Sequence, residues 1–348
     1  MKAGISLVEL AQKIESRKAL KKDFIADTRE LRLNAEGNSL TINGHTEVAP
    51  TENCHRQIGD RLGIPGRYYD RMRSETPALL AENVNTWFAK KPERRMVRTL
   101  GPAGRAFLSD RYLRYENEDA MNAVLPAFAD YPGLKIESCD LTESRLYIKA
   151  ILPSRQGEVK VGDVVQAGVI IRNSEIGLGA ISAQGFIKKL ACLNGMVIPD
   201  SGFRQHHVGS RAVEGELVYE YLADDTLKAD DHATLLKLRD TIKFILSQEM
   251  LDRVLGKLRG AAEQRLEGNP AKAIEVLGKR VGLLEKEQGD VLRYLIEGGD
   301  ISRWGVANAV TRFAQDPESY DRATELEEIG GRIIDLPKTD WSAIAQAA

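Results

Sequence analysis

The spacing of apolar residues predicts both helices and strands over the first third of the chain. Leu7, Leu10 and Ile14 recur at helical spacing, and FIADTRELRLN and SLTINGHTEV then alternate as two short strands separated by a turn. From Asn53 the pattern becomes helical and breaks at residues 64–66, Ile-Pro-Gly. We therefore expect an opening helix, two short strands, and two helices around a tight break.

The middle of the chain has the period-two alternation and the turn residues of a β-sheet. RRMVRTL and RAFLSD flank Gly101-Pro102-Ala103-Gly104, which suits a hairpin, and a helix is expected from about residue 118 to 129. LKIESCDL, RLYIKAILP and VVQAGVIIRNS predict three more strands, each bounded by turn residues. The next segment, GFIKKLACLNGMV, predicts a helix that ends at Asn194-Gly195 and packs Cys192 in its apolar face.

Beyond residue 230 the pattern is almost entirely helical. Six apolar positions trace one amphipathic helix: Leu235, Leu238, Ile242, Ile245, Val254 and Leu258. Gly298-Gly299 ends a later helix, and Asp300 or Ser302 can cap the next one.

These elements predict an α+β fold, with an antiparallel or mixed sheet core, packed helices and a C-terminal helical region. We divide the chain into an N-terminal appendage (residues 1–50), an α+β core domain (51–212), an acidic linker (213–231) and a helical region (232–348).

Net charge and cysteine content limit the cellular compartments and the classes of binding partner that the sequence favours. The formal net charge is −2, so a surface that binds polyanions requires uneven placement of charge. The three cysteines are widely spaced and lack a C-x-x-C pattern, which argues against a disulfide framework or a zinc knuckle. No segment resembles a signal peptide or approaches the roughly 20 apolar residues of a membrane span. We expect a cytoplasmic protein with no membrane partner, cofactor or metal.

Residues 56–114 carry the strongest functional signal. Thirteen lysines and arginines stand against six acidic residues there, a local excess of +7. Guanidinium groups fork onto phosphate oxygens, and interleaved aromatic rings can stack on bases, which is typical of sequence-tolerant binding of single strands. The expected phosphate contacts are Arg94, Arg95, Arg98, Arg105, Arg111 and Arg114. Tyr112 and Tyr115 are the expected stacking residues, and Lys188, Lys189 and Arg204 form a secondary cationic group.

Two other interpretations of the same segment remain open. The arginines can pair with acids of the C-terminal helices while the aromatic residues fill the core, and no binding face then forms. Alternation in RRMVRTL agrees with this, since Arg95 and Arg98 fall on opposite faces of the strand. RQIGDRLGIPGRYYDRM also fits a helix-turn-helix loosely, with Arg67 and Arg71 on its second helix.

The sequence contains no standard catalytic motif, so we assign no catalytic residue. The enzymatic alternative is a metal-dependent nuclease that uses Asp110 and the loop around His206 and His207. Adjacent histidines project differently, so these two alone do not make a metal site. Cys192 with one of the histidines as nucleophile and base is a weaker alternative.

The order of several segments resembles a known family. RLGIPGRYYDRM, AENVNTWF, RAFLSDRYLRYEN, VIIRNSEIGLGAIS, FIKKLACLNGMV and GGDISRWGVANAVTRFA are similar to the phage- and plasmid-associated proteins grouped as domain of unknown function family 932, from about residue 55 to 335. The resemblance implies a mobile-element protein of a bacterial cytoplasm, in the company of proteins that bind and anneal single strands in recombination. It carries over no catalytic residues.

The residues and the resemblance together predict binding of single-stranded DNA by a homo-oligomer, with strand annealing in phage or plasmid recombination as an extension. A non-catalytic protein-binding factor of a mobile element, for antirestriction or assembly, is the remaining alternative. Such a factor would engage partners through an exposed apolar stripe between Leu235 and Leu258.

Overall fold

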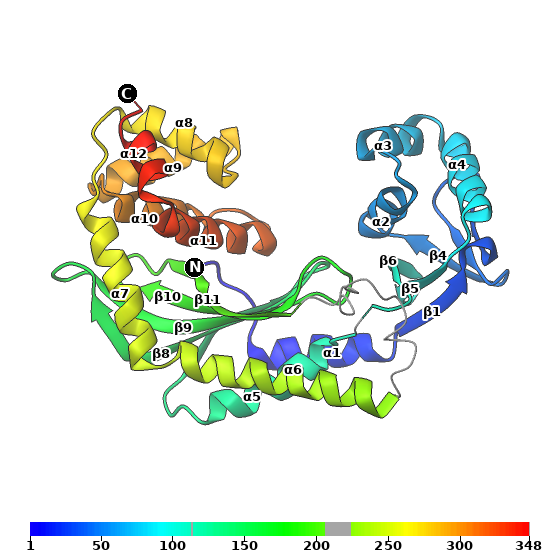
Figure 1. Cartoon of the computed structure of the whole chain (residues 1–348), viewed down its shortest axis with the longest axis horizontal. Helices are drawn as coiled ribbons and strands as arrows, with labels where there is room; N and C mark the ends of the chain where they lie inside the picture. Colours follow the sequence, from blue (N-terminus) through cyan, green and yellow to red (C-terminus); the bar gives the residue numbers. More distant parts are fainter. Residues whose placement is uncertain (113, 206–223, 348) are drawn as a thin grey trace.

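The computed structural model describes residues 1–112, 114–205 and 224–347 and confirms the α+β class (Figure 1). Two sheets carry packed helices, and a helical region follows them. In Figure 1, α1, α5 and α6 lie under the five-stranded sheet, and α8–α12 stand above one end of it. Helices α2–α4 lie with the six-stranded sheet at the other end.

The first sheet has six strands in the order β1-β5-β6-β4-β3-β2. Their bounds are β1 Lys21–Asp27, β2 Leu31–Leu33, β3 Leu40–Ile42, β4 Thr46–Pro50, β5 Arg94–Leu100 and β6 Ala103–Ser109, with a 3-10 turn, η1, at Thr28–Glu30. β5 and β6 form the predicted hairpin. β1 pairs with β5 and β4 with β6, so residues 21–50 are an integral part of this sheet and do not form the expected appendage.

Three helices cover the first sheet: α2 Glu52–Leu62, α3 Gly66–Glu75 and α4 Pro77–Lys90. The predicted break separates α2 from α3, and Gly63 ends α2 in the left-handed conformation at φ 69°. Apolar side chains of all three helices pack against Val97 and Phe107 of the hairpin, among them Ile58, Tyr69, Met72, Leu80, Val84 and Phe88.

The second sheet is an antiparallel meander of five strands in the order β11-β10-β9-β8-β7. Their bounds are β7 Lys135–Leu141, β8 Leu146–Glu158, β9 Val164–Asn173, β10 Ile181–Lys189 and β11 Gly195–Gln205. Side chains of Ile148, Val169 and Ala183 point to the core shared with α1 Leu7–Lys18, α5 Asn117–Ala129 and α6 Asp224–Ile245. Tyr147, Ile170 and Phe186 face the opposite side, toward α11.

The helix predicted for GFIKKLACLNGMV does not exist. This segment forms the end of β10, a turn and the start of β11, with Leu193 in the turn at φ 53°. Both faces of the sheet are covered, so Phe186 and Ile187 are buried on opposite faces and leave an apolar run that also suits a helix. Cys192 lies exposed in the turn, not in a core.

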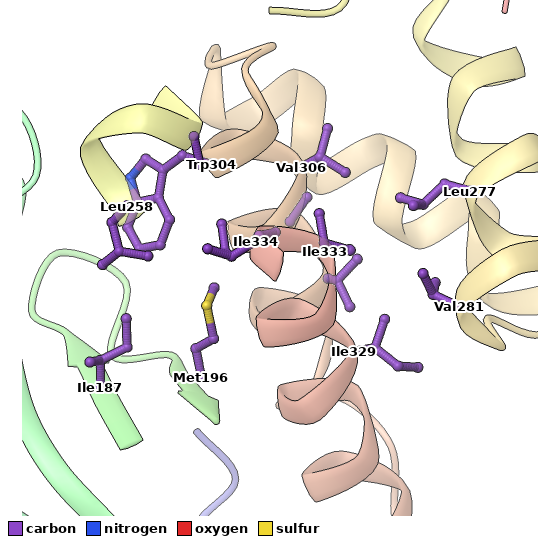
Figure 2. Close-up of a cluster of buried hydrophobic side chains, with 14 of the residues drawn as sticks. Ile187, Met196, Leu258, Leu277, Val281, Trp304, Val306, Ile329, Ile333 and Ile334 are labelled. Atoms are coloured by element: carbon purple, nitrogen blue, oxygen red, sulfur yellow. The ribbon is translucent and has the colours of Figure 1, made fainter. Parts of the chain in front are cut away.

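The C-terminal helices build a separate apolar core against the second sheet. Their bounds are α7 Gln248–Glu263, α8 Pro270–Val281, α9 Glu285–Gly298, α10 Arg303–Phe313, α11 Tyr320–Asp335 and α12 Lys338–Ala345. Gly299 ends α9 at φ 65° and Ser302 caps α10, as predicted. Figure 2 shows part of this core, in which the sheet and four helices meet through Ile187, Met196, Leu258, Leu277, Trp304 and Ile333.

The single amphipathic helix expected around Leu235 to Leu258 is two helices. Ser247 interrupts it and caps α7 by accepting a hydrogen bond from the backbone of Met250. α6 buries Leu238 in the core under the sheet, whereas α7 buries Leu258 in the C-terminal core. The apolar positions therefore form no exposed stripe. None of the helices in the described ranges has the length and apolar character needed to cross a bilayer.

Candidate anion-binding groove

The arginine face predicted around the β5–β6 hairpin does not form. Arg98 is 6% exposed and donates to Asp23 (2.9 Å), to the carboxylate of Glu116 and to the backbone carbonyl of Glu175 (2.8 Å). Arg105 is 8% exposed and lies 3.3 Å from the Glu175 carboxylate. Buried charges require such partners, so these two guanidinium groups stabilise the interior and are not available to phosphate.

The two tyrosines predicted to stack on bases are buried or half-buried. Tyr115 is 2% exposed and lies in the core under the second sheet. The Tyr112 hydroxyl donates to the carbonyl of Ser174 (3.0 Å) and accepts from the backbone of Gly177 (3.2 Å), and burial raises its pKa. The Tyr115 ring therefore offers no face to a base, and the hydroxyl of the half-buried Tyr112 is bound within the protein.

Most of the remaining predicted cations are in ion pairs. The pairs are Arg95 with Glu93, Arg114 with Asp23, Lys188 with Glu137 and Lys189 with Asp163. Arg94 and Arg111 are exposed. Lys188 and Lys189 lie on β10 rather than on the expected helix. The acids involved come from the first half of the chain, not from the C-terminal helices.

The residues of the nuclease alternative do not converge in the described part of the chain. His206 and His207 lie outside the described residues. Asp110 follows β6, and its carboxylate accepts from the hydroxyl of Ser109. Among residues 1–112, 114–205 and 224–347, no group of three His, Cys, Asp or Glu side chains is placed to hold a metal ion.

A different set of polar residues meets on the second sheet. Tyr147, Arg172, Ser182 and Arg204 are successive partners in the strand register, so they form one row across β8, β9, β10 and β11. Adjacent strands are about 4.8 Å apart, so the row spans about 14 Å. Arg172 is the only charged residue in the apolar run of VVQAGVIIRN, and its neighbours bury both faces of β9.

Helix α11 forms the opposite wall of a cavity above this row. Its inward positions, Asp321, Thr324, Glu325 and Glu328, recur at helical spacing and face a volume of about 590 Å³. A second cavity of about 380 Å³ is also lined by Arg204 and Glu328 and extends to Arg332. We call the two cavities the arginine groove, defined by Arg145, Arg172, Arg204, Arg322 and Arg332.

The carboxylates of the arginine groove already have partners within the protein. Asp321 accepts from the Tyr147 hydroxyl at 2.8 Å. Glu328 pairs with Arg172, and Glu325 accepts from Arg322 at 2.6 Å. Glu325 and Glu328 are therefore paired with arginines before any ligand binds, whereas Asp321 is held by neutral hydroxyl groups.

Three of the five arginines lack a carboxylate partner in the described structure. Arg145 donates to the carbonyl oxygen of Leu178. The side chains of Arg204 and Arg332 are exposed and make no hydrogen bond or ion pair with the described residues. Burial lowers the pKa of Arg172 to about 10, and the charges of Arg204 and Arg145 act in the same direction. The groove thus holds crowded positive charge that an anion would relieve.

A buried hydroxyl lines the same cavity. Thr324 is 1% exposed, and its Oγ1 has no hydrogen-bond partner among the described residues. Ser182, 3% exposed, faces the cavity from the sheet side. Hydroxyl donors beside guanidinium groups are the contacts that phosphate oxygens accept, so phosphate suits this donor set.

Sequence reasoning identified one residue of this groove, Arg204, and missed the others. They lie between residues 145 and 332, and only the packing of α11 on the sheet brings them together. One signal was present in the sequence: a lone arginine inside the buried strand VVQAGVIIRN needs a special environment.

In comparisons with protein-family models, with curated proteins and with solved structures, nothing matched this chain. The resemblance to family 932 therefore stays a prediction from the segments quoted above.

Proposed function

We propose that this chain binds single-stranded nucleic acid, DNA in the first instance, and holds the sugar–phosphate backbone in the arginine groove. The observation that carries the proposal is the cross-strand row containing Arg172 and Arg204, flanked by the uncompensated charges of Arg145 and Arg332. Phosphates supply most of the affinity in sequence-tolerant binding. The residues at the β5–β6 hairpin are not part of this proposal, because Arg98 and Arg105 are buried and paired with acids of the interior.

The dimensions of the groove favour a polymer over a single small anion. Its α11 wall runs from Asp321 to Arg332, about 16 Å along the helix axis at 1.5 Å per residue. Cavities of about 590 and 380 Å³ have the size of ligand sites. An extended single strand can follow such a line.

The wider setting follows from the resemblance to mobile-element proteins. In this proposal the protein acts in a bacterial cytoplasm, and a homo-oligomer would bring several grooves onto one strand. Annealing of complementary strands would then be an extension of binding.

The test compares two pairs of arginine substitutions. Fluorescence anisotropy with a labelled 30-nucleotide single strand is measured across a salt series for wild type, for Arg204→Ala with Arg332→Ala, and for Arg94→Ala with Arg111→Ala. The groove pair should lower affinity at least tenfold and reduce the slope of log affinity against log salt by about 1.4, at about 0.7 per lost phosphate contact. The hairpin pair is the control and should stay within twofold of wild type.

Two results would overturn the proposal. One is loss of binding in the hairpin pair with the groove pair unaffected. The other is no salt-dependent binding by the wild-type protein. Thermal unfolding of each variant checks that the substitutions leave the fold intact, as expected for exposed side chains.

A further inference from the structure

The second cavity of the arginine groove contains a buried hydrogen-bond acceptor without a partner. Gln184 on β10 is 7% exposed, and its Nε2 donates to the backbone carbonyl of Pro199 at 3.3 Å. Its Oε1 has no partner among the described residues, although the side chain lines the cavity. Buried polar atoms are nearly always paired, so an unpaired acceptor at a cavity wall points to a donor supplied by a ligand.

Gln184 lies next to the row of phosphate-binding candidates. It follows Ser182 by two residues on β10, so both side chains are on the same face, about 7 Å apart along the strand. Its partner on β11 is Gly202, whose backbone packs closely against Gln184 and also lines the cavity. On this face of the second sheet, the arginine and hydroxyl groups thus lie side by side, and the recess with the unpaired acceptor lies next to them.

We propose that this recess holds the base of a nucleotide whose phosphate lies at Arg172, Arg204 and Thr324, and that Gln184 Oε1 accepts a hydrogen bond from the amino group of cytosine or adenine. The inference rests on the proposed function and names the base that the same groove prefers. Apolar contact with the base comes from Val197 and Pro199.

The chemistry of the recess disfavours thymine. Cytosine and adenine carry an exocyclic amino donor, where thymine carries a carbonyl acceptor. The recess is lined by Arg204 and Arg332, which the proposal assigns to phosphate, and by Glu328, which pairs with Arg172. A thymine carbonyl placed beside Gln184 would face its unpaired Oε1. A hydrogen-bond donor of the base is therefore favourable beside Gln184 Oε1, and an acceptor at the same position is unfavourable.

The experiment compares two pyrimidine homopolymers, so that base size is constant. Affinities for 12-nucleotide oligo-dC and oligo-dT are measured for wild type, Gln184→Leu and Arg204→Ala. Wild type should bind oligo-dC about fivefold more tightly than oligo-dT, the ratio expected of one hydrogen bond. Gln184→Leu should bring the ratio to within twofold and keep the salt slope. Arg204→Ala is the matched control and should weaken both oligomers by a similar factor while keeping the ratio.

A chemical probe tests the same contact without changing the protein. Oligo-dC with both N4 hydrogens replaced by methyl groups lacks the donor and should bind wild type no better than oligo-dT. Equal affinities of wild type for oligo-dC and oligo-dT, with the salt slope present, would overturn the base preference and leave the proposed function standing. No salt-dependent binding of either oligomer would overturn both.

Discussion

Lys149 and Glu327 form an ion pair that has no contact with solvent. Both side chains are 0% exposed, and Nζ lies 2.5 Å from Oε2. The ammonium group is also 4.7 Å from the centre of the Tyr320 ring. Burial lowers the pKa of Lys149 and raises that of Glu327, while the attraction between them opposes both changes. The pair fastens α11 to β8 directly beside the arginine groove.

Glu327→Gln should be strongly destabilising. It leaves a buried ammonium without a counter-charge, which costs about 3–5 kcal/mol of unfolding free energy. Lys149→Met combined with Glu327→Leu removes both charges and should recover most of that loss. Urea denaturation of Glu327→Gln, of the single variants Lys149→Met and Glu327→Leu, and of the double variant measures these values. A double variant as unstable as the sum of the single changes would show that the pair is not the cause.

Two glycines allow α11 to approach its neighbours. A Cβ at Gly331 would lie 1.8 Å from the carbonyl oxygen of Val197 on β11, and one at Gly330 would lie 2.3 Å from Thr311 on α10. Helix α11 therefore packs backbone to backbone against the sheet at this point. The distance between the two walls of the arginine groove depends on this contact.

Gly331→Ala should separate α11 from β11. The added methyl group meets a backbone oxygen that cannot rotate away, and overpacking of this kind costs about 1–3 kcal/mol. The free energy of unfolding in urea should fall because of the overpacking. The affinity for oligonucleotides should also fall, because the groove widens.

Gly289→Ala is the matched helical control. Gly289 is exposed on α9, and a Cβ there meets nothing within 4 Å. Alanine should stabilise the protein by about 0.5–1 kcal/mol through its helix propensity and leave binding unchanged. An equal effect of the two substitutions would contradict the close packing at Gly331.

The junction between the two sheets is a buried ionic network centred on Glu175. Lys21 of β1 lies 2.5 Å from its carboxylate, Arg105 of β6 lies 3.3 Å away, and the backbone of Asn117 donates at 3.0 Å. Burial alone would raise the pKa of Glu175, but the charge and hydrogen bond of Lys21 and the Asn117 amide lower it to about 2. The cationic residues of the first sheet thus hold the second sheet in place.

The network should make the free energy of unfolding depend on pH in the acidic range. A carboxyl group whose pKa is depressed in the folded state contributes stability above its unfolded pKa of about 4.3 and loses it as pH falls toward 2. The free energy of unfolding of the wild type should therefore fall by about 3 kcal/mol between pH 4.3 and 2 through this group. Thermal unfolding at a series of pH values measures the loss. Glu175→Gln should be less stable at pH 7 and show a smaller change over that window. An unchanged pH dependence in the variant would assign the acid sensitivity to other carboxyl groups.

Elements with local signals could be predicted from the amino-acid sequence. Helix caps and stops at Gly299 and Ser302, the glycine-rich hairpin turn after residue 100, and the break between α2 and α3 were all predicted correctly. The α+β class followed from these elements. Local backbone preferences and hydrogen bonds decide such features, so a short window of residues contains the information.

Long-range packing, in contrast, selects which apolar runs become strands and which cations stay unpaired in the described part of the chain. The run around Phe186 suits a helix or a strand buried on both faces, and the sheet partners select the strand. Arg98 and Arg204 look alike in the sequence, yet Arg98 meets acids from β1 and the start of α5, whereas Arg204 meets none in the described chain. Whether a charge binds a ligand depends on which distant residues fold against it, and that is a property of the packed chain.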